Sequence, residues 1–543
     1  MTPTNRNNEE IEGQPYKEYV YSPVPVSSTS AVHHPTTTLT NFYKNNTSKE
    51  SQCVNNKGYH HISQAKKMAE KGSKFLQYLA ATTGNLCIVA TGAMLGWTSP
   101  ILPRLQEDNP LNPDNPLNYP VSKEEASWIG SLVPMGAIFG CFAAGILVEK
   151  IGRKKGLLFS TVPFLIGWIL VASARSIYQL YVARLIFGFA LAVPFTILPM
   201  YIGEIAETSI RGSLGSFLQL FITIGLLFSY AIGPYVSYMV LWIACGSLPI
   251  IFFISFLFMP ESPYFLLGKG QKEDAIKALA RLRGKSTTSV QKEADEMQAT
   301  VDAAFRTQTT LADLFKVKAN FKALLFTCAL VSFQQLTGIN VVLIYAEGIF
   351  KSTGTSLSTS LSTIILGVVQ VLASAVTPLV IERLGRRILL VISGVGTAVT
   401  LGALGLFFFL KDVQHDDVES ISWLPVVSLV IYISLYSIGW GPLPWAVMGE
   451  MFASDVKAKA SGITVFVCWG LAFIITKFFS NIESAFGTHT AFWIFSACCV
   501  VAVLFAVLIL PETKGKSLQE IQDELNGIRP AVPNLEGGPS SKL

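Results

Sequence analysis

The sequence is poor in charged residues for its length. Only 14% of its 543 residues are Asp, Glu, Lys or Arg, whereas a soluble protein carries about 25%. Hydrophobic residues make up 50% and the mean hydropathy is +0.45, so a water-facing surface of this size would lack charge. The net charge of +5 is modest and dispersed. These shortages argue against a soluble enzyme and against a nucleic-acid-binding protein.

Cysteine and histidine are also scarce, and their positions do not suit a disulfide framework or a metal site. Cys53 lies in a polar stretch and the other cysteines lie in apolar runs, which implies no disulfide framework. The six histidines have no cysteine or carboxylate at metal-ligand spacing. No P-loop, G-x-S-x-G or H-E-x-x-H motif stands in a plausible context. We therefore expect no metal, no cofactor and no catalytic residues.

Long apolar runs are abundant. A helix needs about 20 residues to cross a bilayer core about 30 Å thick. Ser213–Met259 can supply two such spans with a turn near Gly233, and two further spans are each interrupted by one cation, Arg184 or Lys477. The remaining runs are Phe75–Pro103, Ala126–Val148, Gly156–Ala174, Ala323–Ala346, Ser352–Ile381, Ile388–Leu410, Ile421–Gly449 and Ser484–Pro511. We predict an all-α polytopic membrane protein with twelve transmembrane helices.

Three short patterns occur twice in the same order, displaced by 233, 246 and 251 residues. The pairs are Glu149–Lys154 and Glu382–Arg387; Glu204 with Arg211 and Glu450 with Lys457; and Pro260–Ser262 and Pro511–Thr513. Near-equal displacements predict an internal duplication. The predicted division is a disordered tail 1–74, a six-helix half 75–259, a linker 260–320 with amphipathic helices, a second half 321–510 and a tail 511–543.

Lys and Arg gather in alternate loops, which places both termini in the cytoplasm. Two equivalent six-helix halves suit a transporter that rocks one half against the other around a central site, whereas a receptor or an enzyme needs no such duplication. Within the linker, Gln271–Arg283 has apolar residues at helical spacing and is predicted to form an amphipathic helix.

The duplicated motifs, together with others along the chain, resemble those of sugar porters of the major facilitator superfamily over about residues 75–525, and most of all those of insect facilitated trehalose transporters. The motifs are Glu149–Lys155, Pro199–Glu204 with Arg211, Pro260–Pro263, Gln334–Asn340, Glu382–Arg387, Gly441–Glu450 and Pro511–Gly515. This resemblance implies the major facilitator fold and sugar transport.

A sugar needs amide or hydroxyl partners at membrane depth and an aromatic face for its C–H side. Gln334, Gln335 and Asn340 lie within seven residues of one span, and Gly338 permits local unwinding. Each buried amide is then either a ligand or an interhelical hydrogen-bonding group. The resemblance adds Gln219, Gln370, Trp445 and Trp469 as substrate-binding residues and Tyr345 as a gating aromatic. Gln370 replaces the family's usual Asn, and Cys468 replaces the Asn that usually precedes Trp469.

Proton-coupled relatives carry a carboxylate on the first span near an arginine that corresponds to Arg184. The stretch Phe75–Pro103 contains no Asp or Glu, and Thr98 occupies the matching position. The missing acid favours passive uniport.

Charged residues near the loops are predicted to form a cytoplasmic ion-pair latch. We expect Glu204 to pair with Arg211, Glu450 with Lys457, and Arg153 and Arg386 with Glu261 or Glu512; Arg184 is assigned to the same set. The alternative is that these charges only fix topology.

The sequence therefore predicts a facilitative transporter of glucose, another hexose or trehalose in the plasma membrane, with a sugar and the lipid bilayer as partners and no obligate protein partner. Two alternatives stay open. One is a proton-coupled sugar symporter, and the other is a non-transporting sugar sensor.

Overall fold

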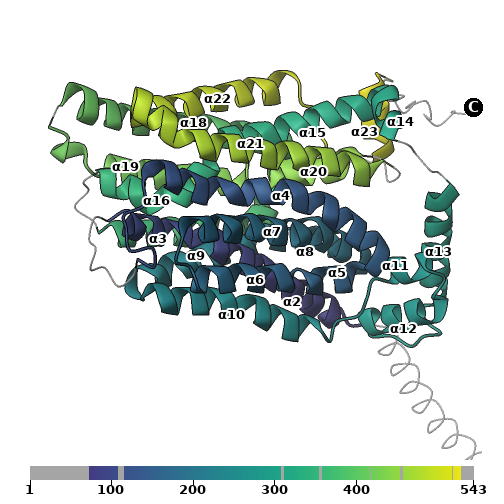
Figure 1. Ribbon diagram of the computed structural model, residues 1–543. Helices are drawn as coiled ribbons and strands as arrows, with labels where there is room; N and C mark the ends of the chain where they lie inside the picture. The colour runs from purple at the N-terminus through teal and green to yellow at the C-terminus, as the bar shows by residue number, and fades with distance from the viewer. Residues whose placement is uncertain are drawn as a thin grey trace, which may run out of the picture. The chain divides into compact units, whose positions relative to one another are not determined.

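The computed structural model is helical, and no strand occurs among the residues that it describes. These are residues 72–107, 115–306, 311–353, 358–415, 417–452, 456–516 and 518–527. Most of the predicted tail 1–74 lies outside them. The helices of the first half (Figure 1) are α2 (Phe75–Gly96), α3 (Thr98–Leu105), α4 (Lys123–Ile151), α5 (Arg153–Phe159), α6 (Thr161–Ala172), α7 (Ile177–Ile205), α8 (Arg211–Gly215), α9 (Phe217–Ile232), η1 (Gly233–Tyr235) and α10 (Tyr238–Phe256).

The linker and the second half continue the pattern. Their elements are α11 (Pro263–Gly268), α12 (Lys272–Arg283), α13 (Gln291–Arg306), α14 (Leu311–Lys316), α15 (Lys318–Leu336), α16 (Ile339–Thr353), α17 (Thr359–Leu384), α18 (Arg386–Phe409), η2 (Leu410–Gln414), η3 (Glu419–Ile421), α19 (Leu424–Ile438), α20 (Leu443–Met451), α21 (Lys457–Phe486), α22 (Thr488–Leu508) and α23 (Leu518–Asn526).

Twelve stretches of the described residues are long and apolar enough to cross a membrane. This confirms the predicted number of spans, and the turn predicted near Gly233 is the short helix η1. Six of the spans lie between Phe75 and Phe256 and six between Lys318 and Leu508. The fold is therefore an all-α polytopic bundle, as the sequence predicts.

Five of the described spans contain two α-helices each, and three of these breaks lie in the first, seventh and tenth spans. The first span changes from α2 to α3 at Trp97, the seventh from α15 to α16 at Gly338, and the tenth from α19 to α20 between Gly439 and Pro442. Gly338 has φ +79°, and a Cβ there would lie 2.6 Å from the ring of Phe495. Only glycine suits this position, and the predicted unwinding at Gly338 is confirmed.

Buried apolar side chains form one cluster between Leu314 and Leu525 and two clusters between Ala80 and Leu282. Ile344, Trp469 and Ala472 are the members of the latter clusters that come from the second half. The halves meet along α4 with α21 and along α9 with α17. The buried core is thus divided between the two halves of the chain. The predicted domain boundaries themselves stay a prediction.

The linker forms the helices α11 to α14, of which α12 and α13 pack against α11 (Figure 1). Helix α12 confirms the predicted amphipathic helix, since Ala275, Leu279 and Leu282 are buried while its charged residues at 272–274 are exposed.

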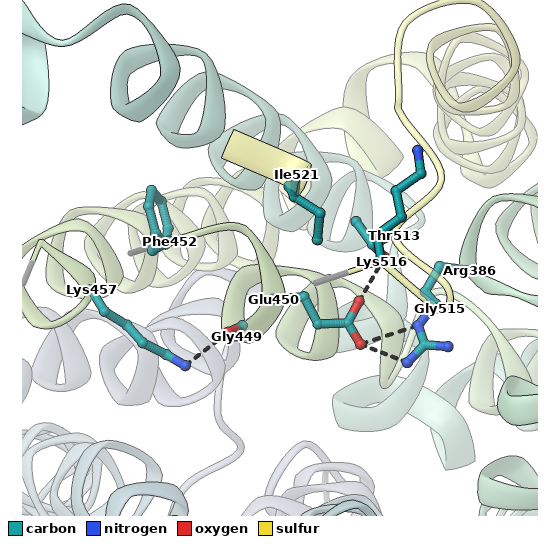
Figure 2. A pocket seen from close by; sticks show the side chains of 9 residues that line it. All are labelled: Arg386, Gly449, Glu450, Phe452, Lys457, Thr513, Gly515, Lys516 and Ile521. Carbon is teal, nitrogen blue, oxygen red and sulfur yellow. Dashed lines mark hydrogen bonds and ion pairs between the residues drawn. The ribbon is translucent and has the colours of Figure 1, made fainter. Parts of the chain in front are cut away.

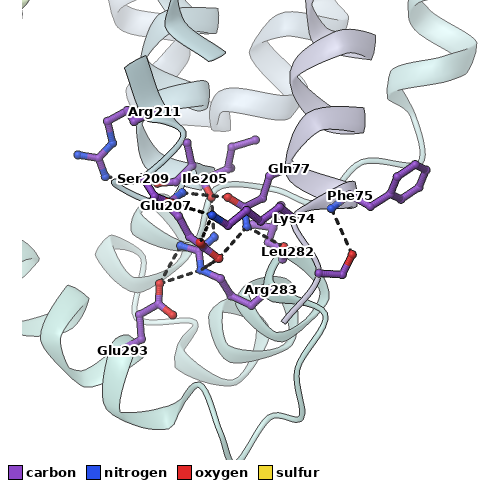
Figure 3. A network of polar contacts seen from close by, with 12 residues as sticks. Lys74, Phe75, Gln77, Ile205, Glu207, Ser209, Arg211, Leu282, Arg283 and Glu293 are labelled. Atoms are coloured by element: carbon purple, nitrogen blue, oxygen red, sulfur yellow. Dashed lines mark hydrogen bonds and ion pairs between the residues drawn. The ribbon is translucent and has the colours of Figure 1, made fainter. Parts of the chain in front are cut away.

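A polar network fastens α12 to the ends of α2 and α7 (Figure 3). The buried Arg283 donates to the carboxylate of Glu293 at 2.7 Å and to the carbonyl of Ile205 at 2.8 Å. Gln77 donates to the carbonyl of Leu282 and accepts from the backbone N–H of Glu207. The start of the linker is therefore hydrogen-bonded to the first half.

Candidate functional site

Gln334 lies opposite the break in the tenth span. Its amide nitrogen donates to the carbonyls of Trp440 at 3.0 Å and Gly441 at 2.7 Å. Both carbonyls belong to the gap between α19 and α20, where the helix cannot pair them. The nitrogen of Gln334 is thus committed to the backbone, which is the helix-bracing alternative considered for this amide.

The break between α15 and α16 is hydrogen-bonded in turn by a side chain of the tenth span. The hydroxyl of Tyr432, on α19, donates to the carbonyl of Thr337 at 3.0 Å, and Thr337 lies in the break between α15 and α16. Each broken span therefore supplies the side chain that pairs the open carbonyl of the other.

Gln335, Asn340 and Cys468 form a second polar group. The amide of Asn340 donates to Oε1 of Gln335 at 2.5 Å, and Nε2 of Gln335 lies 3.1 Å from the sulfur of Cys468. Sulfur is a weak acceptor, so the bond to Cys468 is weaker than a bond to the amide that the family usually has there. Asn340 is half-buried, and Gln335 is 7% exposed.

Three of the predicted substrate-binding and gating residues carry buried polar atoms without a hydrogen-bond partner among the described residues. These atoms are Oε1 of Gln370, Nε1 of Trp469 and the hydroxyl of Tyr345. Gln370 is 2% exposed and Trp469 is 7% exposed. An unpaired buried polar atom costs about 1–3 kcal/mol, which a ligand rich in hydroxyl groups offsets when it donates and accepts there.

Gln219 and Trp445 lie between the halves. A Cβ built on Gly441 would be 3.5 Å from Nε2 of Gln219, so this glutamine of α9 reaches the break in the tenth span. The ring of Phe195, on α7, lies 6.5 Å from that of Trp445 and 6.0 Å from that of Trp469. The structure therefore links the predicted aromatic residues through Phe195, which sequence reasoning missed.

Arg184 is fully buried and belongs to a different region. Its guanidinium donates to the carbonyls of Ile129 at 2.9 Å and Met94 at 3.2 Å and lies over the ring of Trp97. Arg184 and Glu204 are 20 residues apart on α7, or about 30 Å at 1.5 Å per residue. Assigning Arg184 to the latch is therefore wrong.

In the first half, the latch is built around Arg153 at the start of α5. Its guanidinium forms an ion pair with Glu204 at 2.8 Å, and Ser262 donates to the same carboxylate. The Glu261 carboxylate accepts from the backbone N–H groups of Arg153 and Lys154, each at 3.0 Å. Glu261 thus caps the N-terminus of the helix that carries Arg153.

In the second half, the same arrangement recurs at the start of α18 (Figure 2). Arg386 pairs with Glu450 at 2.6 Å, and Thr513 donates to that carboxylate at 2.6 Å. Glu512 accepts from the backbone N–H groups of Arg386 at 3.0 Å and Arg387 at 2.9 Å. The residues of the duplicated motifs therefore make the same contacts in both halves.

The predicted pairings are corrected. The guanidinium groups of Arg153 and Arg386 pair with Glu204 and Glu450 instead of Glu261 or Glu512, which accept from the backbone N–H groups of these arginines. Arg211 donates to the carbonyl of Ala206, at 3.4 Å, and Lys457 donates to the carbonyl of Gly449, at 2.8 Å; neither forms the ion pair expected with Glu204 or Glu450. These carboxylates are occupied by arginines whose planar fork fits a carboxylate better than a lysine or a more distant guanidinium does.

The electrostatic surroundings of the latch differ from group to group. Desolvation by the surrounding helices lowers the pKa of Lys457, although the side chain reaches solvent, and the positive charge of Arg211 lowers it further. Partial burial alone would raise the pKa of the Glu512 carboxyl, but the backbone N–H groups that it accepts from lower the pKa below its usual range.

The halves are joined at the opposite end of the spans. Lys477, on α21, forms an ion pair with Glu124 of α4, donates to Ser127 at 2.9 Å and lies 4.4 Å from the ring centroid of Trp128. The Lys477 side chain is 8% exposed and that of Glu124 is 57% exposed. This cation was predicted only as an interruption of the eleventh span.

Further hydrogen bonds strengthen this junction. The hydroxyl of Tyr230 donates to the carbonyl of Leu343 at 2.8 Å, and the backbone N–H of Glu347 donates to the hydroxyl of Ser99 at 3.2 Å. Each bond joins one half to the other. The structure is therefore tied between the halves at the end away from the latch.

Comparison with known proteins identifies the class. The sequence model of the family described as Sugar (and other) transporter matches residues 36–525, so the chain belongs to this family. The expected membership is confirmed, and the chain is a multi-pass membrane protein of a transporter family.

Individual insect relatives are similar to this chain over most of its length. The facilitated trehalose transporter Tret1 of Culex quinquefasciatus is 36% identical over 454 residues, which are 83% of this chain and 86% of the relative. The transporter of the same name from Polypedilum vanderplanki is 37% identical over 455 residues, covering 83% and 88%. The predicted resemblance to insect trehalose transporters is confirmed.

Solved structures agree on the fold. The proton:xylose symporter XylE bound to 6-bromo-6-deoxy-D-glucose is 25% identical, with a TM-score of 0.67, covering 83% of this chain and 98% of that one. An inward-open structure of XylE from E. coli is 22% identical, with a TM-score of 0.67, covering 82% and 99%. The major facilitator fold is therefore shown.

Proposed function

We propose that the protein moves a sugar, trehalose or a hexose such as glucose, down its concentration gradient by alternating access. The observation that carries this proposal is the set of unpartnered buried polar atoms on Gln370, Trp469 and Tyr345. They come from α17, α21 and α16, so each of these three helices carries a buried polar atom without a partner among the described residues. A sugar, with many hydroxyl groups that both donate and accept, matches this need.

The other predicted substrate-binding residues complete the proposed site. Gln219 and Trp445 would contact the sugar from opposite halves, since both lie at the break of the tenth span. Gln334 and Gln335 hold the broken helices in place, and Asn340 is the half-buried amide of the group.

In the proposed cycle, the two ends of the spans open in turn. The Lys477 to Glu124 ion pair must break when its end opens, because it joins the halves. The latch residues Arg153, Glu204, Glu261, Arg386, Glu450 and Glu512 brace each half. Between the halves, the positive charge of Arg211 lowers the pKa of Lys457. We place the latch end and both termini in the cytoplasm, and the protein in the plasma membrane, from the distribution of Lys and Arg.

Transport without proton coupling is the main proposal. The first span has no acid, and Arg184 is bonded to backbone carbonyls and a tryptophan face rather than to a carboxylate. Proton symport is the second candidate, favoured by Glu347, whose Oε2 is buried without a partner among the described residues. A titratable acid in a span is a functional candidate by default.

Proteoliposomes that contain the purified protein test both candidates. Uptake of labelled trehalose and glucose is measured with and without an inward proton gradient. Saturable uptake that stops at equilibrium and ignores the gradient supports uniport. Accumulation above equilibrium that depends on the gradient, and that Glu347→Gln abolishes, establishes symport instead. Absence of saturable uptake of either sugar contradicts sugar transport by this chain and leaves the sensor alternative.

A further inference from the structure

One phenylalanine of the first half lies between the two predicted platform tryptophans of the second half. Phe195 is on α7, Trp445 on α20 and Trp469 on α21. The ring of Phe195 is tilted by 60° to that of Trp445 and lies nearly perpendicular, at 83°, to that of Trp469. Trp445 and Trp469 are therefore not open platforms, because a third ring stands against both.

The burial of Phe195 differs from that of other phenylalanines in the bundle. Phe187, on the same helix, is fully buried, and Phe142 on α4 is 61% exposed. Phe195 is half-buried, yet both of its aromatic neighbours belong to the opposite half. A ring at this position faces the space between the halves, where the sugar is expected.

We infer that Phe195 determines substrate size: it narrows the space between Trp445 and Trp469 to one that fits a single sugar ring, with its own ring as a third apolar contact. A hexose ring stacks its C–H face on one tryptophan and meets the Phe195 ring at its edge, as aromatic contacts at 4.5–7 Å do. The second ring of a disaccharide competes with Phe195 for the same space. This inference rests on the proposed function, since it assigns a role within the sugar site.

The decisive measurement is the ratio of kcat/KM for trehalose to kcat/KM for glucose in proteoliposomes. Phe195→Ala removes the ring and opens room for a second sugar ring, so the ratio is expected to rise about threefold to tenfold over wild type. An aromatic contact is worth about 0.5–1.5 kcal/mol, which corresponds to this range. Most of the change is expected in KM, because the ring acts on binding.

Two further variants separate the effect of side-chain volume from the effect of the aromatic ring. Phe195→Leu keeps much of the volume without the aromatic ring and is expected to raise the KM for glucose with a smaller change in the ratio. Phe195→Tyr retains the ring and is expected to keep the wild-type ratio. Sugar-induced changes in tryptophan fluorescence of the detergent-purified protein report binding for a variant whose uptake is too low to measure.

Phe142→Ala is the matched control. Phe142 and Phe466 also form a ring contact between the halves, at 6.0 Å, but Phe142 is 61% exposed, whereas Phe195 is half-buried. This variant is expected to keep the wild-type ratio. A ratio in Phe195→Ala that stays within twofold of wild type, or that falls, overturns the inference while sugar transport stands. A wild-type protein that takes up neither sugar overturns both.

Discussion

The two ends of the transmembrane bundle hold their charges in different ways. At the latch end, Arg153 pairs with Glu204 and Arg386 with Glu450, and both partners of each pair belong to the same half. At the other end, Lys477 pairs with a carboxylate of the opposite half. An ion pair inside one half can stabilise that half but cannot by itself hold the two halves together.

Charges between the halves at the latch end are of like sign. Arg211 and Lys457 are close enough for the charge of one to lower the pKa of the other. Duplicated motifs therefore need not form the contact between the halves: here their ion pairs lie within each half, whereas the unrepeated Lys477 pairs across the halves.

Loss of a bracing arginine is expected to have the largest effect. Arg153→Ala and Arg386→Ala each leave a partly buried carboxylate without its strongest partner. Because these side chains are 16% and 19% exposed, we expect each variant to lose about 2 kcal/mol of unfolding free energy, less than for a fully buried pair. Thermal unfolding in detergent measures this loss. Unchanged melting temperatures with reduced uptake would show that the pairs gate transport rather than brace the halves.

Loss of the pair between the halves is expected to change opening rather than stability. In Lys477→Met, Glu124 stays hydrated and the end away from the latch opens more easily. Labelling of Ser127→Cys by a membrane-impermeant maleimide is expected to speed up about threefold to tenfold, or roughly 0.7–1.4 kcal/mol. Ser127→Cys with Lys477 intact is the control. The charge exchange Glu124→Lys with Lys477→Glu should restore slow labelling, and fast labelling in the exchanged protein would count against the pair.

Acidification is expected to weaken the brace of the second half. The pKa of Glu512 is lowered in the folded state, so this carboxylate stabilises the fold above its ordinary pKa of about 4.3. That contribution is lost as the pH falls through the lowered value. Melting temperatures of wild type and Glu512→Gln should differ by about 1–2 °C at pH 7 and converge as the pH falls through the lowered pKa of Glu512. A constant difference at every pH would contradict the role of the charge.

An exposed ion pair of the linker is expected to have the smallest effect on stability and uptake. Lys272 and Asp295 lie 2.8 Å apart with half-exposed side chains, and surface pairs contribute little. Asp295→Asn is expected to leave the melting temperature and uptake unchanged within error. A drop as large as that of Arg153→Ala would mean that the linker helices are part of the brace.

The sequence predicted the regular parts of the molecule well, because span length and apolar runs determine them. The break at Gly338 could also be predicted, since glycine stood between amides in an apolar run. The latch residues were found from their repetition, but their partners were not: Arg211 is near Glu204 in sequence, whereas Arg153, 51 residues away, is near it in space.

Contacts between the halves were beyond sequence reasoning. Lys477 and Glu124 are 353 residues apart, and no local pattern relates them. Phe195 is one of 35 phenylalanines, most of them in apolar runs, and nothing in its neighbours distinguishes it. Such residues are defined by the packing of two halves, which a single sequence does not encode locally.

The reciprocal hydrogen bonds of the broken spans have a mechanical consequence. Gln334 of the seventh span holds the open carbonyls of the tenth, and Tyr432 of the tenth holds that of the seventh. Neither joint can straighten or bend alone, because each one is clamped by the other. We therefore expect a sugar that moves either span to move the other as well, together with Trp445, which lies just beyond the break in the tenth span.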